Sequence, residues 1–288
     1  MRWEGNRESD NVEDRRGDGG GGGGFSFGGG SLSIGGVIIA LIVSFIFGIN
    51  PLTLLGGMSG GSVQQQAPVR QTPANDTEAK FMRVVLADTE DTWSALFQAQ
   101  GATYQPPKLV LFTGRTSTAC GTGQSATGPF YCPADRKVYI DLDFYRLMQE
   151  RFRVSGEFAQ AYVIAHEVGH HVQNLMGLSD KVHGLQQRMD ETQANALSVR
   201  LELQADCFAG VWAFHANRSR HILEQGDVET ALSAATAIGD DALQRQAQGY
   251  VVPDSFTHGT SAQRVRWFRT GLDSGDVAQC DTFEARRL

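Results

Sequence analysis

The sequence predicts an α+β protein that is mainly helical, with a small β-sheet and a single transmembrane helix ahead of the folded domain. Three observations support this fold class. An uncharged apolar stretch lies near the N-terminus, two strand-like segments follow it, and most of the chain beyond Asp143 has helical periodicity. The 288 residues, 41% of them hydrophobic, are enough for one medium domain with attachments.

The N-terminal residues 1–30 are polar, mixed in charge and rich in glycine, with an unbroken glycine run from Gly19 to Gly24. A segment of this composition buries too little apolar surface to offset the entropy lost when the chain is ordered. The sequence therefore predicts that residues 1–30 are disordered.

Residues 31–55 are predicted to form a transmembrane anchor. No ionisable side chain occurs between Asp18 and Arg70, and the stretch from Ile34 to Leu55 is long enough to cross the bilayer core as a helix. A buried core helix and a cleaved signal peptide are the alternatives. The signal peptide fits less well because the preceding region is long and contains acidic residues.

The charges on either side of this segment predict its orientation. Arg15 and Arg16 lie on the N-terminal side, whereas Arg70 is the only nearby basic residue on the other side. The positive-inside rule then keeps the N-terminus in the cytoplasm. A single-pass protein of the inner (cytoplasmic) membrane is expected, with its folded domain periplasmic or extracellular.

Beyond the apolar stretch, residues 56–76 are rich in Gly, Ser, Gln and Pro and are expected to form a flexible linker. Residues 77–288 are expected to form the folded domain. Its predicted elements are one or two helices in Thr77–Gln100, strands at Lys108–Phe112 and Lys137–Leu142, and helices at Ser155–Gly177, Asp190–Phe214, Asp227–Ile238, Asp241–Gln248 and Ser261–Thr270.

The sequence Ala-His-Glu-Val-Gly-His-His contains the pattern His-Glu-x-x-His, formed by His166, Glu167 and His170. Residues four apart on an α-helix stand on the same face, so the two imidazoles can bind one zinc ion. The carboxylate between them can accept a proton from a zinc-bound water. A chance occurrence on a soluble helix is the alternative reading.

A catalytic zinc site needs a third protein ligand. One arrangement has a glycine three residues and a histidine six residues after His170. Gln173 and Met176 occupy these positions, so this arrangement is excluded. The other arrangement takes a carboxylate from a later helix. Glu202 fits this role, and Asp206, four residues on, can hold a ligand histidine by a hydrogen bond. A solvated helix face is the alternative, but the neighbouring residues are largely apolar.

The combination of His-Glu-Val-Gly-His with Glu-Leu-Gln-Ala-Asp resembles the gluzincin class of metallopeptidases. In detail the chain is similar to the bacterial neutral zinc metallopeptidase family. The likeness extends over most of the chain, through Cys120-Gly, Gly128-Pro-Phe-Tyr-Cys132-Pro, Ala205-Asp-Cys207 and Thr257-His258-Gly. The resemblance implies a gluzincin-like domain that holds one Zn²⁺ per chain through His166, His170 and Glu202, with Glu167 as the catalytic base.

The segment from Thr257 to Arg264 also resembles the Thr-His-Pro segment, with its following arginine, of membrane-associated gluzincins. This resemblance implies that His258 stabilises the oxyanion and that Arg264 pairs with a buried acid such as Asp206. Glycine replaces the proline after His258, so the path of the loop can differ. The alternative is a helix N-terminus with an exposed histidine and arginine.

The four cysteines fit two disulfides in an oxidising compartment. Cys120 and Cys132 bracket a short turn-rich loop and are the natural pair, which leaves Cys207 and Cys280 for each other. In the cytosol the same residues would be buried free thiols. Zinc ligation by Cys207 is not expected, because it lies about 140° around the helix from Glu202.

The remaining histidines show no partner pattern. His171 is expected to pack or to lie at the surface, because it points about 100° away from its neighbour His170. His183, His215 and His221 are expected to be exposed.

These observations predict a membrane-anchored zinc metalloendopeptidase that acts on a peptide or protein substrate. The substrate is expected to lie along an edge strand, with Lys137–Leu142 as the candidate. The net charge of −7 gives no basic stripe for nucleic acid. The alternative is a non-catalytic zinc-binding membrane scaffold, against which the presence of Glu167 argues. The sequence gives no oligomeric state.

Overall fold

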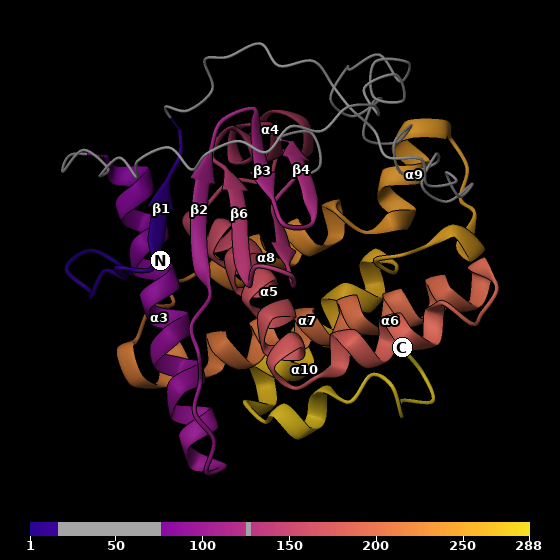
Figure 1. Ribbon diagram of the computed structural model, residues 1–288. Helices are drawn as coiled ribbons and strands as arrows, with labels where there is room; N and C mark the ends of the chain where they lie inside the picture. Colours follow the sequence, from indigo (N-terminus) through magenta and orange to yellow (C-terminus); the bar gives the residue numbers. More distant parts are fainter. Residues whose placement is uncertain (17–75, 125–127) are drawn as a thin grey trace.

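The computed structural model describes residues 1–16, 76–124 and 128–288 (Figure 1). In chain order the elements are β1 (Val12–Asp14), α3 (Thr77–Ala99), β2 (Lys108–Phe112), β3 (Arg115–Thr118), β4 (Gly121–Gln124), β5 (Phe130–Cys132), β6 (Lys137–Asp141), α4 (Asp143–Phe152), α5 (Glu157–Leu175), α6 (Leu178–Gln186), α7 (Glu191–Arg220), α8 (Asp227–Ala237), α9 (Asp240–Gln248), the 3₁₀-helix η2 (Pro253–Ser255), α10 (Ser261–Ser274) and the 3₁₀-helix η3 (Val277–Cys280). This mainly helical α+β architecture confirms the predicted fold class.

The four-stranded sheet has the order β1-β2-β6-β5, and β3 and β4 form a separate hairpin. β2 pairs in parallel with both β1 and β6, while β5 is antiparallel to β6. The side chains of β2 from Leu109 to Phe112 are fully buried, which is typical of a strand covered on both faces. Figure 1 shows α5 between this sheet and the pair α7 and α10. The sheet therefore supports one side of α5, and α7 covers the other.

The predicted helices and strands of residues 77–288 are present, with longer or shorter ends. The predicted helix at Asp190–Phe214 continues to Arg220, and α6 was not predicted. Side chains of the expected type cap three of these helices: the Asp76 carboxylate accepts from the Ala79 amide, Asp190 accepts from Gln193, and Thr260 forms a capping box with Gln263.

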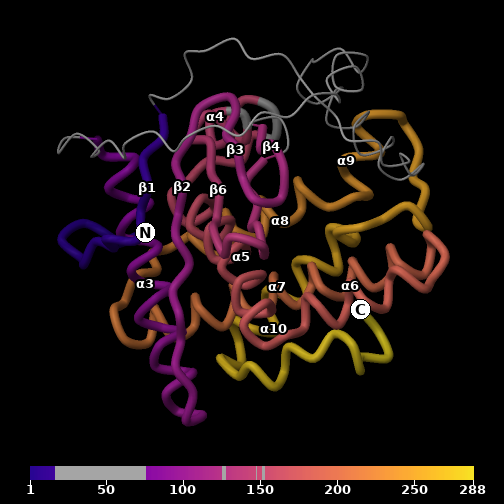
Figure 2. Tube along the Cα trace, viewed as in Figure 1, coloured from indigo at the N-terminus to yellow at the C-terminus, as the bar shows by residue number. Residues whose placement is uncertain are grey.

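The prediction of disorder for residues 1–30 is wrong for residues 1–16. β1 extends the sheet, with Val12 paired to Leu109, and Trp3 is only 5% exposed where it packs against Phe81. Figure 2 shows the N-terminal segment beside α3 and β2. Glycine dominates the composition of residues 1–30 as a whole. The few apolar side chains of residues 1–16 are buried by elements far away in the sequence, which composition does not report. Residues 17–30 lie outside the described residues.

The predicted anchor, residues 31–55, also lies outside the described residues, as does the predicted linker apart from Asp76. Within the ranges 1–16, 76–124 and 128–288, no helix combines the length and the apolar character needed to cross a membrane.

The expectation that Lys137–Leu142 offers an edge to substrate is wrong for Lys137–Tyr139. β2 and β5 pair with the two sides of β6 over these residues, which therefore lie inside the sheet. Ile140 and Asp141 pair with β2, and β5 does not reach them. The alternating pattern that identified the strand does not say how many neighbours it has.

Both predicted disulfides are present. Cys120 is bonded to Cys132, and Cys207 on α7 is bonded to Cys280 in η3. The second bond links residues 73 apart in sequence and fastens the C-terminal segment to α7.

Candidate metal centre

The predicted His-Glu-x-x-His segment lies in the middle of α5, whose residues from Phe158 to Gln173 are almost all buried. At Gly169, α5 lies close against the backbone of α7. A Cβ atom at Gly169 would lie 3.0 Å from the carbonyl oxygen of Ala205, so only glycine fits without displacing α7. This close contact places Glu202, one turn before Asp206, opposite the two histidines.

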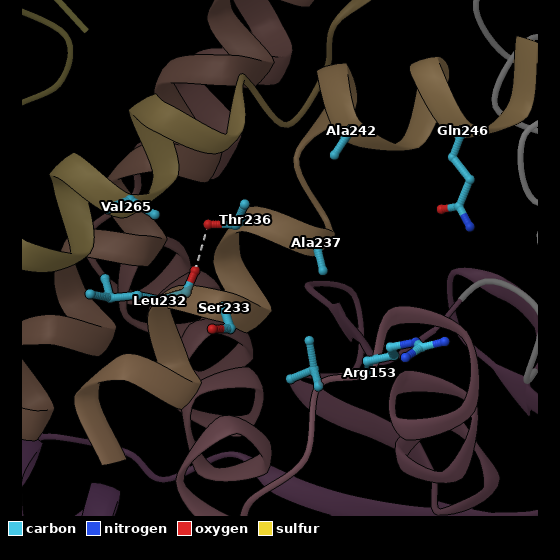
Figure 3. Close-up of a pocket in the computed structure, with 9 residues that line it drawn as sticks. Arg153, Leu232, Ser233, Thr236, Ala237, Ala242, Gln246 and Val265 are labelled. Atoms are coloured by element: carbon cyan, nitrogen blue, oxygen red, sulfur yellow. Dashed lines mark hydrogen bonds between the residues drawn. The ribbon is translucent and has the colours of Figure 1, made fainter. Parts of the chain in front are cut away.

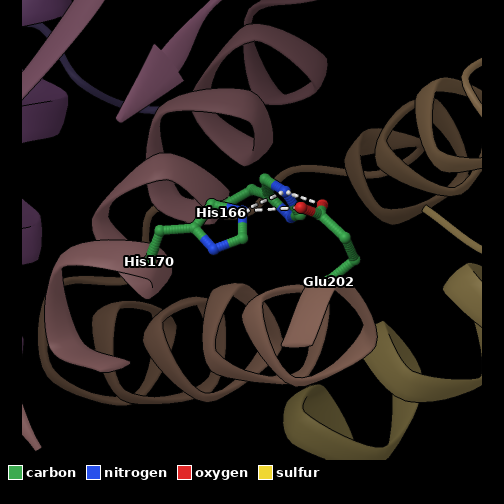
Figure 4. A group of neighbouring side chains, drawn as sticks. All are labelled: His166, His170 and Glu202. Atoms are coloured by element: carbon green, nitrogen blue, oxygen red, sulfur yellow. Dashed lines mark hydrogen bonds and ion pairs between the residues drawn. The ribbon is translucent and has the colours of Figure 1, made fainter. Parts of the chain in front are cut away.

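His166, His170 and Glu202 converge from α5 and α7 (Figure 4). The Nε2 atoms of the two histidines are 3.2 Å apart. The Glu202 carboxylate lies 3.1 Å from Nε2 of His166 and 3.4 Å from Nε2 of His170. Ligand atoms about 2.0–2.1 Å from one tetrahedral zinc are about 3.3 Å apart. The three side chains thus have the spacing of a single zinc site.

The hydrogen bonds around both imidazoles also fit a metal site. Nδ1 of His166 donates to the Asp206 carboxylate at 2.8 Å, and Nδ1 of His170 donates to the side-chain oxygen of Gln173 at 2.9 Å. With the proton on Nδ1, each ring presents the lone pair of Nε2 to the common centre. Nitrogen and carboxylate donors in this number suit zinc with one position left open.

The carboxylate of Glu202 is ionised at this centre. Burial by itself would raise its pKa, but when the two rings are also protonated at Nε2, the charge of His170 and hydrogen bonds from both histidines hold that pKa well below its ordinary value. An anionic carboxylate is the form that binds a metal ion.

Asp206 is fully buried and forms the predicted support for the first histidine. Besides His166 it accepts hydrogen bonds from the hydroxyl of Tyr162 at 2.5 Å and from Arg264, whose Nε and Nη2 reach its two oxygens at 2.8 and 2.9 Å. Burial would raise the pKa of Asp206, but Arg264 and His166 lower it to about 2. The predicted pairing of Arg264 with Asp206 is therefore present.

Glu167 lies beside the two histidines on α5 and is 8% exposed. Within the described part of the chain its carboxylate makes neither a hydrogen bond nor an ion pair. Burial raises the pKa of Glu167 above its ordinary value. A carboxylate with these properties can act as a proton acceptor, because no group among the described residues occupies its oxygens.

The chain matches the family described as "Putative neutral zinc metallopeptidase" over residues 1–283. The chain belongs to this family. It is 57% identical to "Uncharacterized protein YpfJ" of Escherichia coli (strain K12) over 288 residues, which cover 98% of this chain and 99% of the relative. It is 39% identical to "Uncharacterized protein Rv2575" of Mycobacterium tuberculosis (strain ATCC 25618 / H37Rv) over 256 residues, 82% of this chain and 86% of the relative. No solved structure gives a significant match.

In this member of the family, His258 lies in the loop between η2 and α10. Its side chain is 43% exposed, and Nδ1 is 3.2 Å from the Asp240 carboxylate. Burial would lower the pKa of His258, but the hydrogen bond with Asp240 and the nearby charge of Glu202 raise it. The structure therefore brings the predicted histidine to the same end of α7 as Glu202.

Two residues of the site were not predicted from the sequence. Tyr162 lies one turn before His166 and binds Asp206, and Gln173 lies three residues after His170 and binds its ring. Gln173 also donates to the carbonyl of Leu201 and to Gln204, which joins α5 to α7. The helical spacing to the ligand histidines was the signal that could have identified both.

The other histidines have structural roles. His171 is fully buried and bridges the hydroxyl of Tyr131 and the carbonyl of Gln105, as its predicted packing role requires. Burial lowers its pKa to about 4. His183 and His221 are exposed as predicted, whereas His215 is half-buried and donates to the carbonyl of Gly275, so that prediction is wrong.

A surface cavity of about 620 Å³ lies between α8, α9 and α10 and reaches Arg153 after α4 (Figure 3). Its lining includes Leu232, Thr236 and Gln246, and none of the metal-centre residues contributes to it. We assign no chemistry to this cavity.

Proposed function

We propose that this chain is a zinc-dependent endopeptidase, with His166, His170 and Glu202 as the metal ligands and Glu167 as the general base. The observation that carries the proposal is the position of Glu167, a buried carboxylate with no hydrogen-bond partner among the described residues, on the same helix as the two histidines of the three-ligand centre. A metal site with a purely structural role needs no base, and it usually has four protein ligands.

Each side chain of the site has a separate role in the proposed hydrolysis of a peptide bond. His166, His170 and Glu202 would hold a zinc ion, which would supply a Lewis acid at this centre. Glu167 takes a proton from the attacking water, whose oxygen bonds to the scissile carbonyl carbon. As the C–N bond breaks, Glu167 passes the proton to the leaving amine. His258 is placed to donate a hydrogen bond to the carbonyl oxygen as negative charge develops on it.

We further propose that the domain acts outside the cytoplasm and at the membrane, on peptide or protein substrates. Both disulfides support an oxidising compartment. The apolar stretch at residues 31–55 supports membrane association.

Removal and return of the metal test this function. We expect the purified full-length chain to cleave an unfolded protein, to lose this activity after dialysis against a chelator, and to recover it with one zinc per chain but not with magnesium. Metal analysis and gel electrophoresis of the substrate are the measurements. A chain that binds one zinc with its three ligands intact, yet cleaves nothing in a broad peptide library, would support a zinc-binding scaffold instead.

A further inference from the structure

The loop that carries His258 is held by Asp240, a residue for which no role was predicted. Asp240, the first residue of α9, is 9% exposed, and its Oδ2 atom accepts hydrogen bonds from three consecutive backbone amides. The distances are 2.8 Å to Thr257, 2.6 Å to His258 and 3.0 Å to Gly259. The backbone amide of Asp240 in turn donates to the carbonyl of Gly259 at 2.9 Å.

The second oxygen of Asp240 reaches the imidazole itself. Oδ1 lies 3.2 Å from Nδ1 of His258, and the hydroxyl of Thr257 lies 3.0 Å from the same nitrogen. A carboxylate only accepts, so the Nδ1 atom beside it carries the proton. Nε2 is then the ring atom left for a partner outside the loop.

The same loop is fixed against the metal helix. Gly259 has φ +90°, and a Cβ atom there would lie 3.2 Å from Val199 and 3.3 Å from Leu203. Both contacts are on α7 and flank Glu202 in the sequence. The loop is thus clamped between α9 and α7, with His258 held next to the ligand residues.

We propose that Asp240 is a positioning residue of the peptidase, which orients His258 through Nδ1 and favours its charged form, so that Nε2–H can donate to the substrate carbonyl. This inference rests on the proposed function. The charged groups that act on His258 are Asp240 from α9, Glu202 from α7 and Arg264 from α10. Of these, Asp240 is the one hydrogen-bonded to the ring in the described part of the chain.

The test is Asp240→Asn in the zinc-loaded full-length protein. Asparagine keeps one acceptor oxygen for the backbone amides but removes the negative charge beside the ring. We expect kcat/KM to fall about 10- to 100-fold, as for other residues that orient a catalytic group, with little change in KM and unchanged zinc content. The charged form of His258 loses its carboxylate partner in this variant, so the pKa of His258 falls. Because the charged ring is the donor, we expect activity to decline at a lower pH than in the wild type as the pH is raised.

Asp241→Asn is the matched control. Asp241 is the next residue of α9, and its carboxylate accepts from the backbone and hydroxyl of Ser261, not from His258. The titration of His258, followed by NMR and assigned with His258→Ala, gives a readout apart from turnover. A shift in the pKa of His258 that occurs in Asp240→Asn and not in Asp241→Asn supports the proposal. It does so even when the wild type is inactive, because inactivity of the wild type counts only against the proposed function. An unchanged titration, or an equal shift in Asp241→Asn, overturns it.

A second, independent inference concerns the N-terminal segment. β1 is bonded to β2 within the sheet, and the backbone amide of Leu109 donates to the carbonyl of Asn11 at 2.8 Å. The buried carboxylate of Glu90 on α3 accepts its hydrogen bonds from this segment, at 2.6 Å from the hydroxyl of Ser9, 2.8 Å from the side chain of Asn11 and 3.0 Å from Arg7. These hydrogen bonds and the strand pairing join residues 7–14 to α3 and β2 of the domain.

We infer that residues 1–16 and the domain that begins at Asp76 lie in the same compartment. A bilayer core is about 30 Å thick, whereas paired strands are about 4.8 Å apart. An odd number of membrane crossings between residues 16 and 76 would put β1 and β2 on opposite faces of the membrane. This inferred topology differs from the orientation that Arg15 and Arg16 predict, in which the N-terminus is cytoplasmic and the domain is external.

Cysteine labelling of the full chain in intact cells tests this topology. Asn6→Cys and Ser233→Cys place single thiols at exposed positions of the N-terminal segment and of α8. We expect a membrane-impermeant maleimide to label both variants, or neither until the cells are permeabilised. Labelling of one and protection of the other, repeated with Glu4→Cys and Glu229→Cys, would establish opposite sides and overturn the inference.

Discussion

Replacing Glu167 by glutamine is expected to abolish peptide hydrolysis while leaving zinc bound. Glutamine has nearly the same shape as glutamate but cannot accept a proton from water. General-base catalysis is worth about 10²- to 10⁴-fold, so we expect kcat to fall at least about 10²-fold. The three ligands do not depend on Glu167, because their described hydrogen bonds go to Asp206, Gln173 and one another. One zinc per chain should remain.

Stability gives this experiment an internal check. The carboxylate of Glu167 is buried without a hydrogen-bond partner in the described part of the chain, so the substitution breaks no hydrogen bond there and removes a charge that burial disfavours. We therefore expect the Tm of the variant to equal or exceed that of the wild type. A loss of activity accompanied by a lower Tm would indicate misfolding, and not the loss of a base.

Glu229→Gln is the control for this substitution. Glu229 lies on the exposed side of α8 and undergoes the same chemical change. We expect it to retain wild-type activity and zinc content. Substantial residual hydrolysis by Glu167→Gln, measured by initial rates on the same unfolded substrate, would remove Glu167 from the mechanism.

The local part of the metal centre could be predicted from the sequence. The spacing of His166 and His170 is a property of a single helix, and so is that of Glu202 and Asp206. The packing of α5 against α7 is a tertiary contact. The only sign of it in the sequence was the apolar character of the residues around Glu202. The contact at Gly169 makes the approach of α7 possible, and no periodicity reports on it.

The parts that could not be predicted depend on residues far apart in the chain. β1 is a three-residue strand whose burial comes from β2, almost a hundred residues later. Its local composition therefore indicates disorder, because sequence windows do not include the partner. The role of Asp240 also depends on distant residues, because its carboxylate binds the amides of Thr257, His258 and Gly259. Whether β6 is an edge strand likewise depends on which strands pair with it.

Replacing Arg264 by methionine is expected to destabilise the domain strongly. The guanidinium is 3% exposed and binds both oxygens of Asp206, which is fully buried. Methionine would leave that carboxylate with only Tyr162 and His166 as partners. Removing one member of a buried ion pair costs about 3–5 kcal/mol. In a domain of about 200 residues this is a fall in Tm of roughly 6–20 °C.

Thermal unfolding of the zinc-free protein measures this effect, with Arg269→Met as the control. Arg269 is exposed on the same helix, so the same substitution there should leave Tm nearly unchanged. An Arg264→Met variant as stable as the control would mean that the ion pair does not hold α10 on α7.

The double variant Asp206→Leu with Arg264→Met separates stability from function. An apolar pair of similar size can replace a buried ion pair with little loss of stability, so we expect the double variant to recover most of the Tm. His166 would still lack the acceptor that fixes its Nδ1 proton, and zinc affinity should be about 10- to 100-fold weaker than in the wild type. Recovery of Tm without recovery of zinc affinity would show that Asp206 is kept for the metal centre. If zinc affinity returned together with Tm, the role of Asp206 would be to pack α10 against α7, and the orientation of His166 would not depend on it.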